Sequence, residues 1–221
     1  EIVEDIGGGV LGGRKLKAVQ TGGPSGGVIP DRFLDTRIDY DNLQKLGSIM
    51  GSGGMIVMDE DDCMVDISKF YLQFCVDESC GKCAPCRIGG KQLLDILRGI
   101  TEGKGDTEDI KRIKRICEAM NKASLCGLGQ TAPNPVVSTL NYFEEEYKDH
   151  IEKGLCAAKK CSKLFMFEII QDKCKRCALC QRNCPVGAID GDREKGFVID
   201  QEKCIKCGKC FEVCSFGAIR R

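Results

Sequence analysis

Residues 174–185 read CKRCALCQRNCP, and residues 204–215 read CIKCGKCFEVCS. Each stretch contains four cysteines with the spacing C-x2-C-x2-C-x3-C, and the second stretch begins 30 residues after the first. The similarity continues beyond the cysteines, because Gly187-Ala188-Ile189 recurs as Gly217-Ala218-Ile219. The C-terminal part of the chain is therefore a duplicated unit in which one short motif occurs twice.

This cysteine spacing is that of bacterial ferredoxins with two [4Fe-4S] clusters. In that pattern the first three cysteines of a run bind one cluster, and the fourth binds the other. We therefore expect two ligand sets that cross between the runs: Cys174, Cys177, Cys180 and Cys214 for one cluster, and Cys204, Cys207, Cys210 and Cys184 for the other. Two clusters held close together in this way serve electron transfer.

A pair of zinc knuckles is the alternative interpretation of the same cysteines. Structural zinc is usually bound by two separated pairs, such as C-x2-C followed later by a second C-x2-C. Two tandem runs of four cysteines fit that arrangement poorly. Pro185 follows the first run and Ser215 the second; because this position shapes the chain and binds no iron, we expect both sites to be intact.

Composition narrows the class of protein further. The 221 residues include 33 Lys+Arg and 33 Asp+Glu, so nothing indicates a nucleic-acid or membrane-surface partner. The sequence contains no run of 18 or more apolar residues, so it predicts no membrane span. The chain starts at Glu1 without a signal-peptide pattern. Seventeen cysteines, many of them at metal-ligand spacing, need reduced thiols and indicate a cytoplasmic location.

Four segments between the N-terminal region and residue 149 have helical periodicity, and together they predict an antiparallel four-helix bundle. The first covers residues 66–79 and the second residues 88–100, while the third begins near Asp106 and the fourth at Asn134-Pro135, with Asn134 as cap. The expected inward positions are Ile67, Phe70, Tyr71, Phe74 and Cys75, then Leu93, Leu94, Leu97 and Ile100, then Ile110, Ile113, Ile116, Cys117 and Met120, then Val137, Leu140, Phe143 and Tyr147.

Residues 1–58 are rich in glycine and contain two strand signals. Residues 15–20 alternate as a half-buried strand does, and residues 55–58 form a short apolar run that predicts a buried strand. Gly7, Gly9 and Gly12 satisfy G-x-G-x-x-G, but the motif needs a preceding strand. A helix end followed by a glycine turn is the better interpretation.

A third cluster is predicted in the helical part. Cys80, Cys83 and Cys86 have C-x2-C-x2-C spacing, and a cubane needs one more ligand. Cys126, between Leu125 and Gly127, supplies it in our interpretation. Cys117 is the competing ligand, although its place on an apolar stripe favours the core.

Four stretches together resemble the NADH-oxidising flavoprotein subunit of respiratory complex I, over roughly residues 1–151. They are residues 18–27 (AVQTGGPSGG), 47–55 (GSIMGSGGM), 78–87 (ESCGKCAPCR) and 124–127 (SLCG). The resemblance implies a partial β-grasp (SLBB-like) domain followed by a four-helix domain with one [4Fe-4S] cluster. The added ferredoxin unit makes the chain more similar to the flavin subunit of multimeric, NAD-linked [FeFe] hydrogenases, often electron-bifurcating.

The same resemblance implies cofactors and partners. The family's FMN and NADH sites would precede residue 1, so this chain would be the C-terminal piece of a longer subunit. Implied partners are a catalytic [FeFe] hydrogenase subunit, a thioredoxin-like [2Fe-2S] subunit and soluble ferredoxin. NADP-reducing hydrogenases and NAD-linked formate dehydrogenases share these parts and are alternatives.

The only histidine lies in the polar connection before the ferredoxin unit. His150, Cys156 and Cys161 have short spacings in a segment expected to be exposed, and they are candidate zinc ligands. An ordinary histidine at a helix end beside incidental cysteines is the alternative. Three ligands leave the site open, and the fourth could be Cys117, another cysteine or a partner's residue.

The sequence thus predicts an α+β chain with four parts: residues 1–58 (partial β-grasp), 59–149 (helical [4Fe-4S] domain), 150–166 (linker with a zinc site) and 167–221 (ferredoxin domain). We expect an electron conduit within a multisubunit oxidoreductase, with no catalytic residues in this chain. A zinc-binding scaffold without redox activity is the rival from another class.

Overall fold

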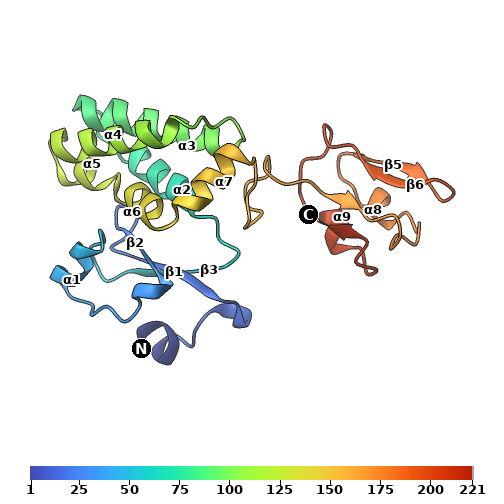
Figure 1. Cartoon of the computed structure of the whole chain (residues 1–221), viewed down its shortest axis with the longest axis horizontal. Helices are drawn as coiled ribbons and strands as arrows, with labels where there is room; N and C mark the ends of the chain where they lie inside the picture. The colour runs from blue at the N-terminus through green and yellow to red at the C-terminus, as the bar shows by residue number, and fades with distance from the viewer. Residues whose placement is uncertain (221) are drawn as a thin grey trace. The chain divides into compact units, whose positions relative to one another are not determined.

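The computed structural model describes residues 1–220, which fall into two compact units (Figure 1). The first unit is Glu1–Cys161, and the second begins at Ser162. The segment 150–161, expected within a linker, therefore belongs to the first unit. Each unit is described by itself below.

The first unit opens with a small antiparallel sheet in the order β2-β1-β3. The strands are β1 (Leu16–Thr21), β2 (Val28–Pro30) and β3 (Met55–Asp59). The turn between β1 and β2 needs glycine, because a Cβ at Gly26 would lie 1.7 Å from the carbonyl oxygen of Thr21. The expected burial of β3 is wrong: Ile56 and Val57 are 46% and 40% exposed, and only Met58 of this strand is buried in the core.

Short helical segments surround this sheet. A helical turn at Ile2–Ile6 leads into glycines with positive φ, which confirms the predicted helix end and glycine turn. The others are helical turns at Leu11–Gly13 and Asp31–Phe33 and the helix α1 (Tyr40–Lys45), which the side chain of Asp39 caps.

Six helices form the rest of the first unit, and Figure 1 shows them beside the sheet. They are α2 (Met64–Asp77), α3 (Gly90–Thr101), α4 (Asp109–Ala123), α5 (Gly127–Thr131), α6 (Asn134–Tyr142) and α7 (Glu144–Glu152). A π-helical turn, Pro85–Gly89, runs directly into α3. In the part of the chain that the structure describes, none of the helices has the length and apolar character that a membrane crossing requires.

The buried faces of α3 and α4 agree closely with the periodicity, but the face of α2 differs. Phe70 and Phe74 were expected inside, yet they are 66% and 46% exposed. Tyr71 and Cys75 of the expected stripe are buried as predicted, and the rest of the buried face of α2 consists of Met64, Val65, Ser68 and Leu72. The polar Ser68 is accommodated there because its hydroxyl hydrogen-bonds to the buried Tyr147 hydroxyl at 2.9 Å.

The last expected helix also differs from its prediction. It is two helices, α6 and α7, which meet at Phe143, where the backbone leaves helical geometry (φ −133°, ψ 35°). Val137 points partly outward at 38% exposure. Asn134 does not cap α6, because its side-chain amide donates to the carbonyl oxygen of Ser25 instead. The short helix α5 lies between α4 and α6.

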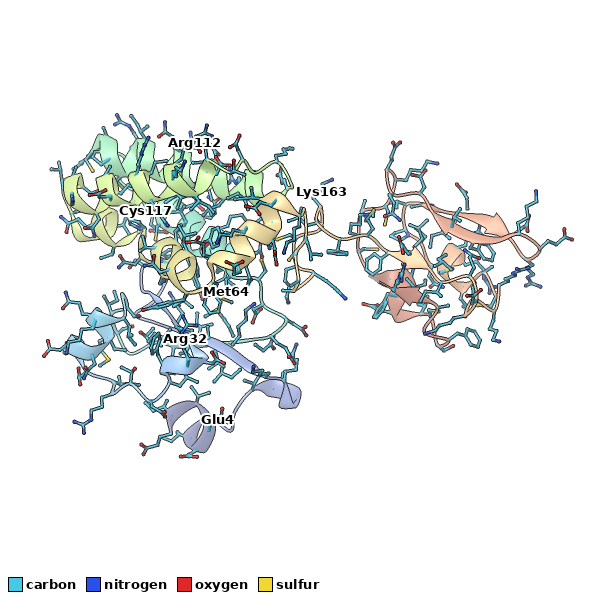
Figure 2. The ribbon with its side chains drawn as sticks, viewed as in Figure 1. Glu4, Arg32, Met64, Arg112, Cys117 and Lys163 are labelled. Atoms are coloured by element: carbon cyan, nitrogen blue, oxygen red, sulfur yellow. The ribbon has the colours of Figure 1, made fainter. Side chains whose placement is uncertain are left out.

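Sheet and helices are joined through one core and one ion pair. Ala18, Val28 and Met58 of the sheet pack with Met64. Met64 is the first residue of α2 and is labelled in Figure 2. Beside them, Lys17 Nζ lies 2.7 Å from a carboxylate oxygen of Glu146. The other oxygen of this carboxylate accepts the backbone N–H of Met64 at 3.0 Å. Glu146 therefore holds the start of α2 against α7.

The second unit repeats its own structure. Its elements are β4 (Glu168–Ile169), α8 (Leu179–Arg182), β5 (Ile189–Asp192), β6 (Gly196–Ile199), α9 (Lys209–Glu212) and β7 (Ile219–Arg220). Antiparallel pairs join β4 with β7 and β5 with β6. The core takes matching members from both copies, Cys180 with Cys210 and Ile189 with Ile219. The duplicated sequence is thus a duplicated fold.

Candidate iron–sulfur and metal centres

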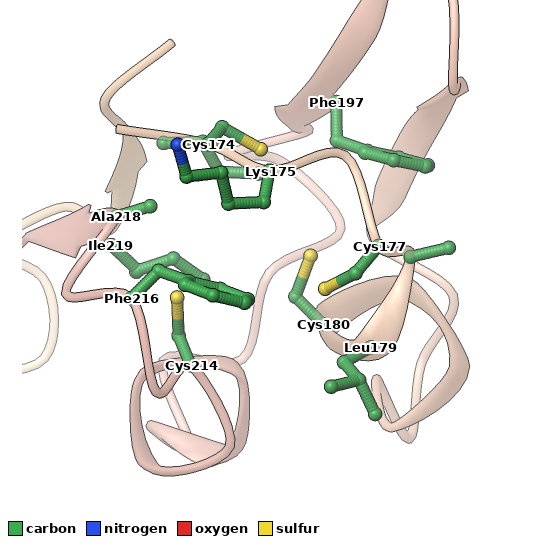
Figure 3. A pocket seen from close by; sticks show the side chains of 12 residues that line it. Cys174, Lys175, Cys177, Leu179, Cys180, Phe197, Cys214, Phe216, Ala218 and Ile219 are labelled. Carbon is green, nitrogen blue, oxygen red and sulfur yellow. The ribbon is translucent and has the colours of Figure 1, made fainter. Parts of the chain in front are cut away.

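Four cysteines face one cavity in the second unit. The lining includes Cys174, Cys177 and Cys180 from the first run and Cys214 from the second. Figure 3 shows their sulfur atoms pointing into this common space, with Phe197, Phe216 and Ile219 around them. This is the first of the two sets expected from the spacing.

A second cavity has the complementary composition. Its lining includes Cys204, Cys207 and Cys210 from the second run and Cys184 from the first. Each cavity thus draws three cysteines from one run and one from the other. Four soft thiol donors around a small apolar space match what a [4Fe-4S] cluster requires.

The loops achieve this convergence through left-handed residues at matching positions. Arg176 and Ala178 in the first run have φ of 53° and 60°, and Lys206 and Gly208 in the second have 59° and 80°. Non-glycine residues rarely adopt positive φ. The bends between the cysteines turn successive side chains toward one point instead of along an extended chain.

The remaining cysteine motif lies at the turn that leads into α3. Cys86 lies in Pro85–Gly89, and Cys126 is the residue that precedes α5. The backbone N–H groups of Leu125 and Cys86 lower the pKa of the Cys83 thiol. The segment around Cys126 therefore reaches the Cys83 thiol, as a four-cysteine site from these two segments requires.

The packing leaves room only for glycine between the two segments. A Cβ at Gly129 would lie 2.7 Å from Ser124 Cβ and 3.0 Å from Cys86 Cβ. The Ser79 hydroxyl lies 3.3 Å from Cys86 Sγ, and Arg87 donates to the carbonyl oxygen of Gly81 at 2.7 Å. The cysteine loop is fixed from both sides.

Cys117, the competing ligand, lies on α4 (Figure 2) and is 2% exposed. Burial raises the pKa of its thiol to about 12. A buried cysteine on the apolar stripe of a helix packs as a small apolar group. These properties favour Cys126 as the fourth ligand.

A different kind of site lies at the end of the first unit. Cys63, His150, Cys156 and Cys161 are all buried, and their ligand atoms lie within 4.8 Å of one another. His150, Cys156 and Cys161 were expected in an exposed connection, but they are 2%, 1% and 4% exposed. That expectation was wrong because the connection folds back onto the start of α2, where Cys63 lies.

The distances within this set are those of a tetrahedral zinc site. His150 Nε2 lies 3.3 Å from Cys63 Sγ and 3.4 Å from Cys161 Sγ, and the two sulfurs are 3.8 Å apart. Zinc bonds of about 2.3 Å to sulfur and 2.0–2.1 Å to nitrogen place two sulfurs about 3.8 Å apart, and sulfur and nitrogen about 3.5 Å apart. Within residues 1–220 this is the one set of three or more such side chains that is so compact.

The neighbours of His150 prepare its ring for a metal. Nδ1 lies 2.6 Å from the carbonyl oxygen of Glu146, so the N–H on this atom donates to the backbone. Nε2 is then the ring atom that faces the cysteines, and a metal would bind there in place of a proton. This is the arrangement by which metal-binding histidines are usually oriented.

The electrostatics of the set favour positive charge at its centre. Hydrogen bonds with Cys161 and Cys63 lower the pKa of Cys156, and the contact with Cys156 raises the pKa of Cys161. Burial lowers the pKa of His150, but hydrogen bonds with Cys156 and Cys63 outweigh it and raise the value to about 10. A thiolate is thus stabilised beside a cation, and a divalent metal would stabilise further thiolates.

Cys63 was missed by the sequence reasoning, which left the fourth ligand open. A signal was present, however. Of the 17 cysteines, twelve belong to the cluster motifs and two to the histidine group, which leaves three. Cys75 and Cys117 fall on apolar helical stripes, so Cys63 is the one without an assignment.

Comparison with known protein families agrees with this arrangement. Residues 66–150 match the NADH-ubiquinone oxidoreductase-F iron-sulfur binding region. Residues 173–218 match a 4Fe-4S dicluster domain. The first region contains Cys80, Cys83, Cys86 and Cys126, and the second contains both four-cysteine runs.

Two curated relatives are similar over most of this chain. One is the NADP-reducing hydrogenase subunit HndC of Solidesulfovibrio fructosivorans, 52% identical over 88% of this chain and 40% of the relative. Another is the F 2 subunit of NADH-quinone oxidoreductase in Rhizobium meliloti, 40% identical over 71% of this chain and 37% of the relative. The chain therefore spans about two fifths of the length of these relatives.

A solved structure shows the same fold over part of the chain. An NAD+-reducing [NiFe]-hydrogenase in the H2-reduced state superposes with a TM-score of 0.57 and 29% identity. The match covers 63% of this chain and 24% of the hydrogenase chain.

Proposed function

The chain is the iron–sulfur, electron-transfer part of a protein of the NADH-quinone oxidoreductase F type, and from this premise we propose that it holds three [4Fe-4S] clusters. Cys80, Cys83, Cys86 and Cys126 would hold one cluster in the first unit. The two crossed sets of the second unit would hold the others. The observation that carries the proposal is the exchange of the fourth cysteine between the runs: Cys214 lines the cavity of the first run, and Cys184 lines that of the second.

When bound, such clusters supply one-electron transfer, and the chain's own residues set where it occurs. Cys180 and Cys210 are buried in the core of the second unit and fix the two cavities close together. Phe167, Phe197 and Ile189 pack around these cysteines and keep water from that side. Cys80 and Cys126 are exposed, which leaves the site of the first unit open to a neighbouring redox group.

We further propose domain types for this chain, and cofactors and partners for the longer subunit. The sheet of residues 1–58 would belong to a β-grasp domain, and the helices to a four-helix domain with additional turns. FMN and NAD(H) or NADP(H) would bind outside this chain, in the longer subunit. The similarity to a hydrogenase subunit favours a multisubunit hydrogenase with a catalytic [FeFe] subunit and a thioredoxin-like [2Fe-2S] subunit as partners, in the cytoplasm.

The set of Cys63, His150, Cys156 and Cys161 would hold a structural zinc ion. Four protein ligands close a tetrahedral site and leave no position for substrate. Its role would be to fasten the segment that leads to the second unit onto the start of α2.

Metal analysis and spectroscopy test the proposal. The chain, prepared without oxygen, should contain about 12 iron atoms, as expected for three cubanes, and one zinc. Reduced samples should show three paramagnetic centres, while FMN and NADH should not bind. A content of about eight iron atoms would contradict the proposed cluster of the first unit. Zinc without iron would favour the interpretation as a scaffold without redox activity.

A further inference from the structure

Two serine hydroxyls flank the cysteines of the first unit, and each has a hydrogen atom to give. Ser79 lies one residue before Cys80, and Ser124 lies two residues before Cys126. Neither residue is a cluster ligand. Their geometry shows which way each hydroxyl can donate.

The Ser79 hydroxyl already accepts one hydrogen bond. The backbone N–H of Gly81 donates to Ser79 Oγ at 3.3 Å. The single hydrogen of this hydroxyl is then free for Cys86 Sγ, which lies 3.3 Å away. Either group can donate while Cys86 is a thiol, but a thiolate can only accept, so the hydroxyl is the donor once Cys86 binds the cluster.

Ser124 is buried at 5% exposure, and its Oγ has no hydrogen-bond partner among residues 1–220. The backbone of the residue is held in place, because its N–H donates to the carbonyl oxygen of Met120 and its own carbonyl accepts from the Gln130 side chain. A buried hydroxyl without a hydrogen-bond partner destabilises the fold. The position thus requires an acceptor.

The space beside Ser124 is that of the cysteines. A Cβ at Gly129 would lie 2.8 Å from Ser124 Oγ and 3.0 Å from Cys86 Cβ, so both groups border one small gap. Thiolate and sulfide sulfurs of a bound cluster would be the acceptors.

We propose that the hydroxyls of Ser79 and Ser124 donate hydrogen bonds to sulfur atoms of the cluster held by Cys80, Cys83, Cys86 and Cys126, and thereby raise its reduction potential. This inference rests on the proposed cluster of the first unit. Reduction adds negative charge, and hydrogen bonds to the sulfurs stabilise that charge. The two serines are positioning residues that set how readily this centre accepts an electron.

A redox titration followed by electron paramagnetic resonance tests the inference on the whole chain. Ser79→Ala and Ser124→Ala should each make reduction of this cluster about tenfold less favourable, or about 59 mV for one electron. Combining both changes should lower the potential further. The two clusters of the second unit serve as the internal reference and should keep their potentials.

Two control variants separate this effect from a general loss of packing. Ser79→Thr keeps the hydroxyl and should restore the original potential. Ser138→Ala removes a buried hydroxyl that is paired with the Val28 N–H at 2.9 Å, and it should not move the potential of the cluster. Unchanged potentials in Ser79→Ala and Ser124→Ala, with iron retained, would overturn the inference.

If Ser124→Ala does not retain iron, the reduction potential of Ser79→Ala alone tests the inference, because Ser79 is only half-buried. If neither retains iron, resonance Raman spectra of the unmodified protein decide. Deuterium oxide should then shift the Fe–S(Cys) stretches, and unshifted bands would overturn the inference. Absence of the cluster from the unmodified protein would instead refute the proposed function, so the two failures differ.

Discussion

His150 Nε2 lies 3.3 Å from Cys63 Sγ, although the two residues are 87 positions apart in the chain. One belongs to α7 and the other directly precedes α2. A metal held by both would therefore link the two ends of the helical part, and its binding energy would contribute to folding.

Replacement of Cys63 by Ala should abolish zinc binding and leave the iron content unchanged. A site with three ligands loses the closed tetrahedral geometry that structural zinc requires. Cys75→Ala is the matched control, because Cys75 is equally buried but pairs with the carbonyl oxygen of Pro24. Metal analysis of the purified variants gives the answer; zinc that persists in Cys63→Ala, or is absent from the unmodified chain, contradicts the assignment.

Glu146→Ala should weaken zinc binding about 10- to 100-fold, which is the usual effect of removing a group that supports metal ligands. The carboxylate joins Lys17 to the Met64 N–H and so fixes the position of Cys63. Glu145→Ala is the control, since this neighbouring side chain is 82% exposed and pairs only with Lys148 among the described contacts. Competition with a chromogenic chelator measures both affinities, and equal affinities would exclude the support role.

The crossed ligand sets predict which cysteine variants share a spectrum. Cys214→Ser and Cys177→Ser should perturb the same cluster, because both residues line one cavity. Cys184→Ser and Cys207→Ser should perturb the other. Electron paramagnetic resonance of the four reduced variants sorts them into pairs. If Cys214→Ser instead matches Cys207→Ser, each run binds its own cluster and the crossed arrangement is wrong.

The choice between Cys126 and Cys117 can be decided by iron content. Cys126→Ser should lose the cluster of the first unit, leaving about eight of 12 irons. Cys117→Ser should keep all of them, although it places a hydroxyl in a core position and should lower the thermal midpoint. Iron analysis and a melting curve distinguish the two residues, and the reverse pattern would make Cys117 the ligand.

The second unit could be read from the sequence because its information is local. Ligands three residues apart and a repeat of 30 residues define the crossed sets without knowledge of the fold. The helices with one clear apolar stripe, such as α3 with Leu93 and Leu97, could be predicted equally well. In α3 the residues that pack together are close in sequence, and in the cluster sites the repeat identifies the fourth cysteine although it comes from the other run.

The failures came from contacts between distant segments. The sequence pattern alone does not distinguish the face of α2 that contains Phe70 and Phe74 from the face that is buried. The hydrogen bond between Ser68 and Tyr147 on α7 identifies the buried face. Cys63 has no cysteine at motif spacing, and its partners come from a segment with the polar composition of an exposed connection. Asn134 is a good cap by type, but the carbonyl of Ser25 competes for its amide.

Each cavity takes its fourth cysteine, Cys214 or Cys184, from the other copy of the repeat. One copy by itself would therefore lack the fourth ligand of this arrangement. A solitary copy would have to exchange its fourth cysteine with a second polypeptide, as a symmetric dimer. Duplication makes this exchange intramolecular, and the effective concentration of the missing thiol is then fixed by the fold. Once joined, the copies were free to diverge, and the lining of one cavity now has Lys175 where the other has Ile205. Two originally equivalent cluster sites would thus have become chemically different sites on one electron-transfer path.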